Sequence, residues 1–378
     1  MKVPFLDLKR QYESIKEEIN EAIQTVLESQ QFILGPRVEE FERRIANYCN
    51  AKHAIGVASG TDALLLSLKA SGISGGVVTT PFTFFATAGA IHNAGATPIF
   101  ADIEPDTYNI DAEEVKKLLG SKSNKMIRAI IPVHLFGQAA DMDAIMKIAE
   151  EHDLVVIEDA AQAIGEEYNG KKVGSMSIGC FSFFPSKNLG GYGDGGLITT
   201  NDDELADKIR TLRMHGAKPK YYHHVIGYNT RLDTIQAAIL AVKLNHLEEW
   251  TTKRRDNARF YSKALSDITE DELELPQIAE GRKHIFNQYT IRVKNGRRDN
   301  LKEFLEGQGI STAIYYPLPL HLQPCFSFLG YKRGDFPVAE EASKEVLSLP
   351  VYPDLEREER EYVVKKILEF FEVEKDVQ

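Results

Sequence analysis

The sequence predicts an α/β protein with a large domain, built on a mainly parallel β-sheet, and a smaller α+β domain. Between residues 53 and 214, short runs rich in β-branched and aromatic residues alternate with helical segments. This alternation is typical of a parallel sheet with helices on both faces. The chain has 378 residues, which is more than one hydrophobic core usually supports. We therefore expect two domains, residues 1–245 and 246–378.

Apolar periodicity and turn residues place the individual elements in order along the chain. Helical spacing predicts helices at 12–28 and 38–48, separated by the helix-breaking Leu34-Gly35-Pro36. Strands then alternate with helices: we expect strands at 53–59, 77–80, 98–101, 126–133, 154–158, 180–184 and 197–200, and helices at 62–70, 84–94, 111–119, 141–151 and 202–214. A long helix at 232–264 leads into the smaller domain, where we expect a strand at 289–293 and helices at 299–308, 339–347 and 355–373.

Composition argues against several classes of protein. The net charge of −11 disfavours nucleic acid or an anionic membrane surface as the main partner. The three cysteines, Cys49, Cys180 and Cys325, are widely spaced, so we expect neither a disulfide framework nor a metal site. The N-terminus lacks a long apolar stretch, and no segment approaches about 18 uncharged apolar residues. We expect a soluble cytoplasmic protein.

The first candidate site is the turn Ser59-Gly60-Thr61, between a predicted strand and a predicted helix. Gly60 allows the backbone to come close to a ligand, and free N–H groups of a first helical turn suit a phosphate. A plain helix cap made by Ser59 or Thr61 is the alternative. The chain contains neither G-x-G-x-x-G nor G-x-x-x-x-G-K-[ST], which disfavours the common nucleotide-binding folds.

The second candidate is Asp159, at the end of an apolar run that reads as a buried strand. In open α/β sheets, ligands bind beyond the carboxyl ends of the strands, where this carboxylate would lie. A protonated pyridine nitrogen is one possible partner. Alternatively, Asp159 caps the following helix.

The third candidate is Lys187, which follows an aromatic strand and a proline and precedes a glycine-rich turn. Burial lowers the pKa of an amine and makes it a better nucleophile toward an aldehyde. Ser182, five residues earlier, is placed to donate its hydroxyl to a phosphate, and Phe84 in an aromatic cluster could stack on a flat ring. The alternatives are a surface lysine on a loop and ordinary core packing of the aromatic residues.

The order of these features resembles that of fold-type I enzymes dependent on pyridoxal phosphate (PLP), and more closely the DegT/StrS family of sugar aminotransferases. The resemblance covers nearly the whole chain. It rests on Pro4-Phe5-Leu6-Asp7-Leu8, Ser59-Gly60-Thr61-Asp62-Ala63-Leu64, Glu158-Asp159-Ala160-Ala161-Gln162, Phe181-Ser182-Phe183, Lys187, Gly193-Asp194-Gly195-Gly196, Tyr228-Asn229-Thr230-Arg231-Leu232-Asp233, Tyr316-Pro317 and Leu347-Ser348-Leu349-Pro350.

The resemblance implies an aspartate-aminotransferase-like fold with a seven-stranded sheet, and a role for each matching residue. Lys187 would hold PLP as a Schiff base and move the proton, while Asp159 would pair with the pyridine nitrogen and Phe84 would stack on the ring. The phosphate would lie among Gly60, Thr61 and Ser182, with Asn229 reaching it from the other subunit of a homodimer. Gln162 stands where many members have a histidine beside the phenolic oxygen of the cofactor.

The resemblance also implies a substrate class, an amino group moved from L-glutamate to a nucleotide-linked keto-sugar in surface-polysaccharide or amino-sugar biosynthesis. We expect reaction at C3 of a UDP- or dTDP-linked 3-keto sugar, with a C4-aminotransferase as the alternative. Expected substrate-binding residues are His215, Arg231, Tyr316 and His321, although each histidine could equally be a solvated loop residue. A sugar dehydratase of the same family would carry histidine in place of Lys187, and a non-catalytic regulatory protein would tolerate loss of Lys187 or Asp159.

Overall fold

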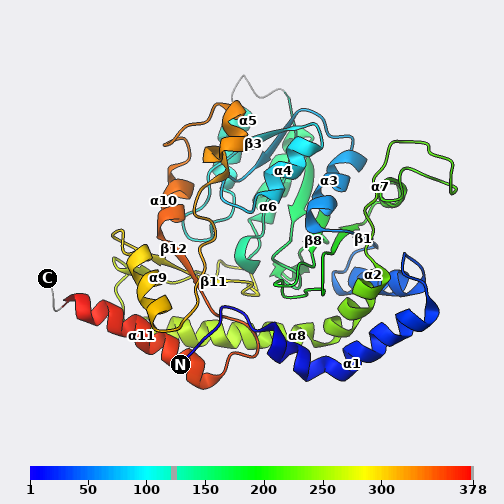
Figure 1. The fold of residues 1–378 in the computed structure, drawn as a ribbon. Coiled ribbons are helices and arrows are strands. Elements are labelled where there is room, and N and C mark those ends of the chain that lie inside the picture. The colour runs from blue at the N-terminus through cyan, green and yellow to red at the C-terminus, as the bar shows by residue number, and fades with distance from the viewer. Residues whose placement is uncertain (121–125, 376–378) are drawn as a thin grey trace.

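The computed structural model describes residues 1–120 and 126–375 and confirms the predicted fold class (Figure 1). A seven-stranded sheet has the order β1-β9-β8-β5-β4-β2-β3. β9 runs antiparallel to both of its neighbours, and the other pairs are parallel. The strands are β1 (His53–Val57), β2 (Gly76–Thr79), β3 (Thr97–Phe100), β4 (Ile127–Ile130), β5 (Val155–Asp159), β8 (Ile178–Ser182) and β9 (Gly196–Thr200). Each corresponds to one of the seven predicted strands.

Helices cover both faces of this sheet because successive strand residues point to opposite sides. Val156 packs in the core on one face, whereas Ile157 packs in the core on the other. The first face is covered by α2 (Pro36–Tyr48), α5 (Ala112–Gly120), α6 (Met142–His152) and α8 (Thr234–Ala264). The opposite face is covered by α3 (Gly60–Ala70), α4 (Ala86–Asn93) and α7 (Asp203–Leu212). A short hairpin, β6 (Glu167–Tyr168) and β7 (Lys171–Lys172), and the 3-10 helix η1 (Leu135–Gly137) complete this part.

The smaller domain contains a three-stranded antiparallel sheet, β10 (Leu273–Glu274), β11 (Tyr289–Val293) and β12 (Val346–Leu349). Its helices are α9 (Arg298–Gly307), α10 (Pro337–Glu345) and α11 (Arg357–Lys375), with the 3-10 helices η2 (Leu320–Leu322) and η3 (Pro324–Leu329). The predicted helix at 339–347 is wrong at its end. Val346 and Leu347 pair with β11 instead of continuing α10, because sheet pairing overrides the helical pattern.

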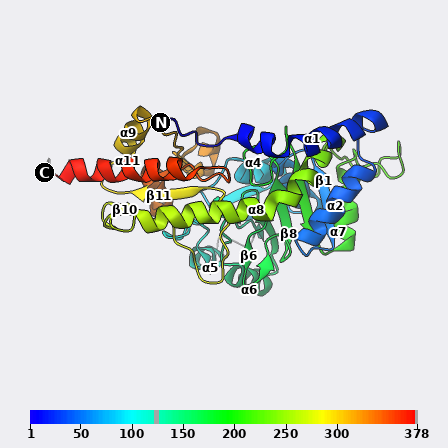
Figure 2. The same ribbon diagram turned by 90° about the horizontal axis from the view of Figure 1, so that it is seen from below.

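α8 and α1 (Leu8–Ser29) lie together along one side of the molecule, and α11 lies beside α8 (Figure 2). Leu247 of α8 packs in the core of the large domain, whereas Ala258 and Tyr261 pack in the core of the smaller one. The proposed domain boundary at residue 246 therefore falls inside a continuous helix that serves both cores. Among the helices described, none combines the length and apolar character that a membrane span requires.

Candidate active site

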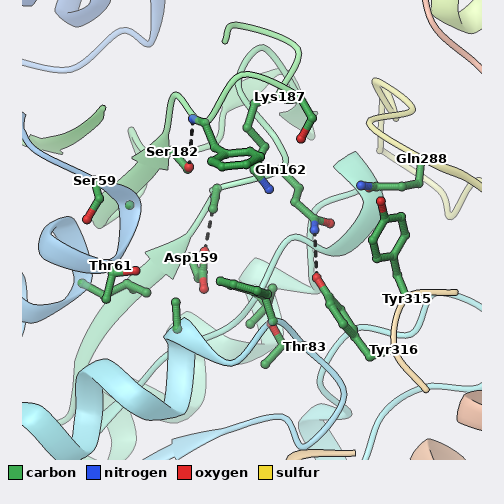
Figure 3. Close-up of a pocket in the computed structure, with 18 of the residues that line it drawn as sticks. Ser59, Thr61, Thr83, Asp159, Gln162, Ser182, Lys187, Gln288, Tyr315 and Tyr316 are labelled. Atoms are coloured by element: carbon green, nitrogen blue, oxygen red, sulfur yellow. Dashed lines mark hydrogen bonds between the residues drawn. The ribbon is translucent and has the colours of Figure 1, made fainter. Parts of the chain in front are cut away.

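A cavity of about 610 Å³ opens at the carboxyl ends of β5 and β8. Eight of the twelve residues predicted for the site line it: Gly60, Thr61, Phe84, Asp159, Gln162, Ser182, Lys187 and Tyr316. In Figure 3, Ser59, Thr61 and Ser182 lie on one side of the cavity, and Gln288, Tyr315 and Tyr316 lie on the other, with Lys187 and Asp159 between them. The cavity thus has two distinct polar ends and a charged centre.

Asp159 is the last residue of β5 and is almost completely buried, with 5% of its surface exposed. One carboxylate oxygen accepts a hydrogen bond from Oγ1 of Thr87 at 2.8 Å, and the other accepts one from the Ala161 amide at 3.2 Å. Burial raises the pKa of Asp159, while these hydrogen bonds and the charge of Lys187 act in the opposite direction. A cation beside this carboxylate would favour its ionised form.

Lys187 lies on the tight turn that follows β8, and its side chain points into the cavity (Figure 3). Its amide donates to the Phe184 carbonyl at 2.9 Å, which closes the turn. Burial lowers the pKa of the Lys187 ammonium to about 8, and the charge of Asp159 partly opposes this shift. A large share of the amine is therefore neutral, and nucleophilic, near pH 8.

The N-terminus of α3 faces the cavity through Gly60 and Thr61. The first backbone bond of this helix joins the Ala63 amide to the Ser59 carbonyl, so the amides of Gly60 and Thr61 precede the bonds of the helix itself. Ser182 accepts from the Phe184 amide at 3.3 Å, which leaves its hydroxyl proton available. These donors and the positive end of the helix dipole form a cradle suited to an anion.

Gln162 and Tyr316 are joined across the cavity by a hydrogen bond from Nε2 of Gln162 to the Tyr316 hydroxyl, at 3.1 Å. Oε1 of Gln162 accepts from the Phe136 amide, so the orientation of the carboxamide is fixed. One N–H of Gln162 remains for a ligand. Phe84 is 59% exposed, which leaves the face of its ring accessible from the cavity.

His321 does not line the cavity, so its predicted role in substrate binding has no contact in this structure to support it and stays a prediction. Its ring is buried, and Nε2 lies 3.0 Å from Oε1 of Glu340. Burial also lowers the pKa of His321, which disfavours a charged imidazolium. This histidine joins η2 to α10 within the smaller domain.

The predicted residues His215, Asn229 and Arg231 do not line the cavity of their own chain. They belong to the segment after α7, which projects from the body of the molecule in Figure 1. His215 and Asn229 are exposed, and the Met214–Asn229 bridge closes the base of the projection. Their predicted roles therefore stay predictions.

Among the lining or supporting residues that were not predicted for the site are Thr87, Gln288 and Tyr315. Thr87 lies in the first turn of α4, and its hydroxyl holds Asp159, a pairing that only the folded chain brings together. Gln288 reaches the cavity from the residue before β11, and no pattern in the sequence distinguishes it. Tyr315 adjoins the predicted Tyr316, so this position carried the clearest missed signal.

The arrangement fits pyridoxal phosphate. A buried amine of lowered pKa suits the aldehyde, a buried carboxylate suits the ring nitrogen, and the α3 N-terminus suits the phosphate. A sequence profile described as the DegT/DnrJ/EryC1/StrS aminotransferase family matches residues 13–368. The chain belongs to this family. It is a sugar aminotransferase by class, and pyridoxal phosphate is its cofactor.

Relatives resemble the chain along nearly its full length. The pleiotropic regulatory protein of Geobacillus stearothermophilus is 56% identical over 98% of this chain and 99% of its own. The dTDP-3-amino-3,4,6-trideoxy-alpha-D-glucose transaminase of Streptomyces venezuelae is 41% identical, with 98% and 97% covered. The UDP-2-acetamido-2-deoxy-3-oxo-D-glucuronate aminotransferase of Pseudomonas aeruginosa is 43% identical, with 94% and 96% covered.

Solved structures agree with the fold. S. venezuelae DesV in complex with a ketimine intermediate superposes with a TM-score of 0.94 at 40% identity, over 98% of each chain. NtdA from Bacillus subtilis, with its cofactor PMP bound, has a TM-score of 0.90 at 32% identity, over 97% of this chain and 85% of that one.

Proposed function

We propose that this aminotransferase moves an amino group from L-glutamate to the C3 ketone of a nucleotide-linked sugar. The observation that carries the proposal is the single cavity that holds Lys187, Asp159 and the α3 N-terminus together. Regiochemistry is inferred from two relatives, whose names specify a 3-amino and a 3-oxo sugar. Reaction at C4 is the alternative within the same class.

When bound, pyridoxal phosphate carries the nitrogen between the two substrates and accepts the electrons released at the reacting carbon. The protein supplies the groups around it. The Lys187 amine would hold the aldehyde and would move a proton at the reacting carbon. Asp159 holds the proton on the ring nitrogen, and Thr87 keeps this carboxylate in place.

Five further residues would orient the cofactor. The amides of Gly60 and Thr61 and the hydroxyl of Ser182 hold the phosphate, and the free N–H of Gln162 meets the phenolic oxygen. Phe84 stacks on the ring. Tyr316, which shares the hydrogen bond of Gln162, faces the substrate side.

We further propose a homodimer in which each site uses residues of both chains. The projecting segment carries the exposed Tyr221, Tyr222, Val225 and Ile226, and Ile226 is 96% exposed in a single chain. Apolar side chains gathered on an exposed projection are typical of an interface. Asn229 and Arg231, at the base of the same projection, would then donate to the phosphate and the anionic groups of the substrate in the second subunit.

The test is a panel of dTDP- and UDP-linked 3-keto and 4-keto sugars, each supplied with PLP-loaded enzyme and L-glutamate. We expect 2-oxoglutarate and an amino sugar from a 3-keto substrate, with the position of nitrogen fixed by NMR. Lys187→Ala serves as the control and should give neither product. Amination only at C4 would replace the proposed regiochemistry, and no amination of any keto-sugar would overturn the proposal.

A regulatory function is the second candidate, because the 56% identical relative is named as a regulatory protein. A purely regulatory chain has no need of a nucleophilic amine beside a held carboxylate, and both are present. The two candidates separate in a strain whose chromosomal copy carries Lys187→Ala. If this strain loses both the amino sugar and the regulation seen in the wild type, both depend on catalysis. If it loses the amino sugar but regulates as the wild type does, regulation is a separate function.

A further inference from the structure

The loop that carries Lys187 is fastened to the rest of the protein by side chains on two sides. Asn188 donates to the Ile285 carbonyl at 3.3 Å and accepts from Asn287 at 2.9 Å. On the other side, Oε1 of Gln236 accepts from the Tyr192 amide at 2.8 Å. The loop itself is tightly wound, because a Cβ atom at Gly190 would collide with the Pro185 carbonyl.

Lys243, a second buried lysine, also contacts the loop that carries Lys187. Its ammonium donates to the Gly190 carbonyl at 2.7 Å and lies 4.3 Å from the centre of the Tyr192 ring. Only 1% of Lys243 is exposed, and no carboxylate of the described residues is among the causes that shift its pKa. Lys243 and Gln236 are seven residues apart on α8, so both project from the same face of this helix.

A buried cation without a carboxylate is costly, so its presence here calls for a reason. Burial alone lowers the pKa of Lys243, to about 8. Its charge is not among the causes of the shifted pKa of Lys187, which are burial and Asp159. The contacts of the Lys243 ammonium with the loop of Lys187 are the Tyr192 ring and the Gly190 carbonyl, which would otherwise be a buried acceptor.

We propose that Lys243 is a positioning residue for Lys187: by holding Gly190, it fixes the loop from which the Lys187 amine reaches the aldehyde of the cofactor. The α3 amides of the phosphate cradle and Asp159 are on other elements, and Ser182 belongs to β8, ahead of the Lys187 loop. Loss of Lys243 should therefore impair the bond to the aldehyde and leave the other contacts of the cofactor intact.

The experiment compares two ligands of the apoenzyme by equilibrium titration. PLP can condense with the Lys187 amine, releasing one water, whereas 4′-deoxypyridoxine 5′-phosphate has no aldehyde and binds through its ring and phosphate only. In Lys243→Met, we expect the affinity for PLP to fall about tenfold or more, the scale of one hydrogen bond to a charged group, and the affinity for the analogue to change less than about twofold. Lys187→Ala should show the same selective loss.

Lys172→Met is the matched control. Lys172 also donates to a glycine carbonyl, that of Gly165 at 3.2 Å, and lies 5.0 Å from the centre of a tyrosine ring, but Gly165 is not part of the Lys187 loop. This variant should bind both ligands as the wild type does. Gln236→Leu, which removes the neighbouring fastening, should reproduce the selective loss in weaker form, and it replaces Lys243→Met if that variant fails to fold.

Equal losses for PLP and the analogue would overturn the proposal, because they would show a general distortion of the cavity. Unchanged affinity for PLP would overturn it as well. Neither ligand contains a sugar, so the outcome is independent of the proposed substrate.

Discussion

Burial acts in opposite directions on the pKa values of Lys187 and Asp159, the two charged residues at the centre of the cavity. It lowers the pKa of the lysine and raises that of the aspartate, and the charge of each side chain partly offsets the shift of the other. The pair therefore makes a neutral amine more accessible than an exposed lysine would, beside a carboxylate that a cationic ring would hold ionised. Thr87 and the Ala161 amide supply the hydrogen bonds that favour the ionised carboxylate.

Asp159→Asn should lower kcat by about 100-fold or more, because an amide can hydrogen-bond but does not stabilise a positive ring nitrogen. Thermal unfolding should shift little, since the amide retains the shape and most contacts of the carboxylate. The measurement is steady-state kinetics beside a melting curve of the same preparation. Turnover close to that of the wild type would mean that Asp159 serves only as a cap for the Ala161 amide.

Glu166 lies outside the cavity, and its burial should make the stability of the folded protein depend on pH. It is fully buried, and its Oε1 accepts from the amides of Ala139 and Lys283, both at 3.3 Å, while Oε2 has no hydrogen-bond partner among the described residues. Burial raises the pKa of Glu166 to about 8. Between the usual pKa of about 4.5 and this value, the unfolded chain releases a proton that the folded chain keeps, so stability falls as pH rises.

Glu166→Gln should remove this dependence. The melting temperature of the variant, relative to that of the wild type, should rise between pH 5 and pH 9. The corresponding difference in the free energy of unfolding should change by at most roughly 1.4 kcal/mol per pH unit. Glu167→Gln is the control, because the pKa of Glu167 is lowered beside Lys172 and Lys283 and should give no alkaline gain. A difference that stays constant with pH would show that Glu166 is ionised in the folded protein.

At the scale of elements, the cradle depends on how closely the N-terminus of α3 packs against β8 and β9. A Cβ atom at Gly60 would lie 2.8 Å from Cβ of Ser182, and one at Gly196 would collide with the Ser59 carbonyl. Both glycines therefore let the turn and the two strands meet, which brings the amides of α3 beside the Ser182 hydroxyl.

Gly60→Ala should push Ser182 away from the α3 amides and lower the affinity for PLP by about tenfold, the scale of one lost charge-assisted hydrogen bond. The non-covalent analogue should lose affinity to a similar degree, since the phosphate contacts are shared. Gly307→Ala, where an added Cβ meets nothing within 4 Å, is the control. Unchanged binding of both ligands by Gly60→Ala would place the phosphate elsewhere.

Periodicity in the sequence was enough to predict the seven strands of the large sheet, β11 and the described α-helices, because each amphipathic pattern is local, but it missed the two-residue strands β6, β7 and β10. It was not enough for β12, where residues with a helical pattern follow α10 and pair with β11 across more than 50 positions of sequence. The same reason explains the site. Lys187 and Asp159 carry local signals at strand ends, whereas Thr87 and Gln288 acquire their places only when distant segments fold together.

At the scale of the whole molecule, α8 joins the two cores and supports the Lys187 loop, and the segment after α7 projects away from both. The projection exposes apolar side chains that a single chain leaves uncovered. A second copy is the partner that would bury them and bring Asn229 to a phosphate.

Complementation between inactive variants tests this assembly. Lys187→Ala lacks the amine, and Asn229→Asp places a carboxylate toward the cofactor phosphate, where like charges repel. After dissociation and random reassociation, half of the dimers are mixed and each has one intact site, so about one quarter of the wild-type site capacity should return. No recovery in dimers shown to have exchanged would mean that Asn229 acts within its own chain.

The most direct test of the central claim is to locate the amine that bonds the cofactor. The loaded enzyme is reduced with borohydride, which makes the bond between amine and cofactor permanent, and its peptides are then mapped by mass spectrometry. We predict the reduced cofactor on the peptide that contains Lys187, in about one copy per chain, as one nucleophilic amine per site requires. Labelling of another lysine, Lys243 included, or of none, would contradict the assignment of this cavity as the aminotransferase site.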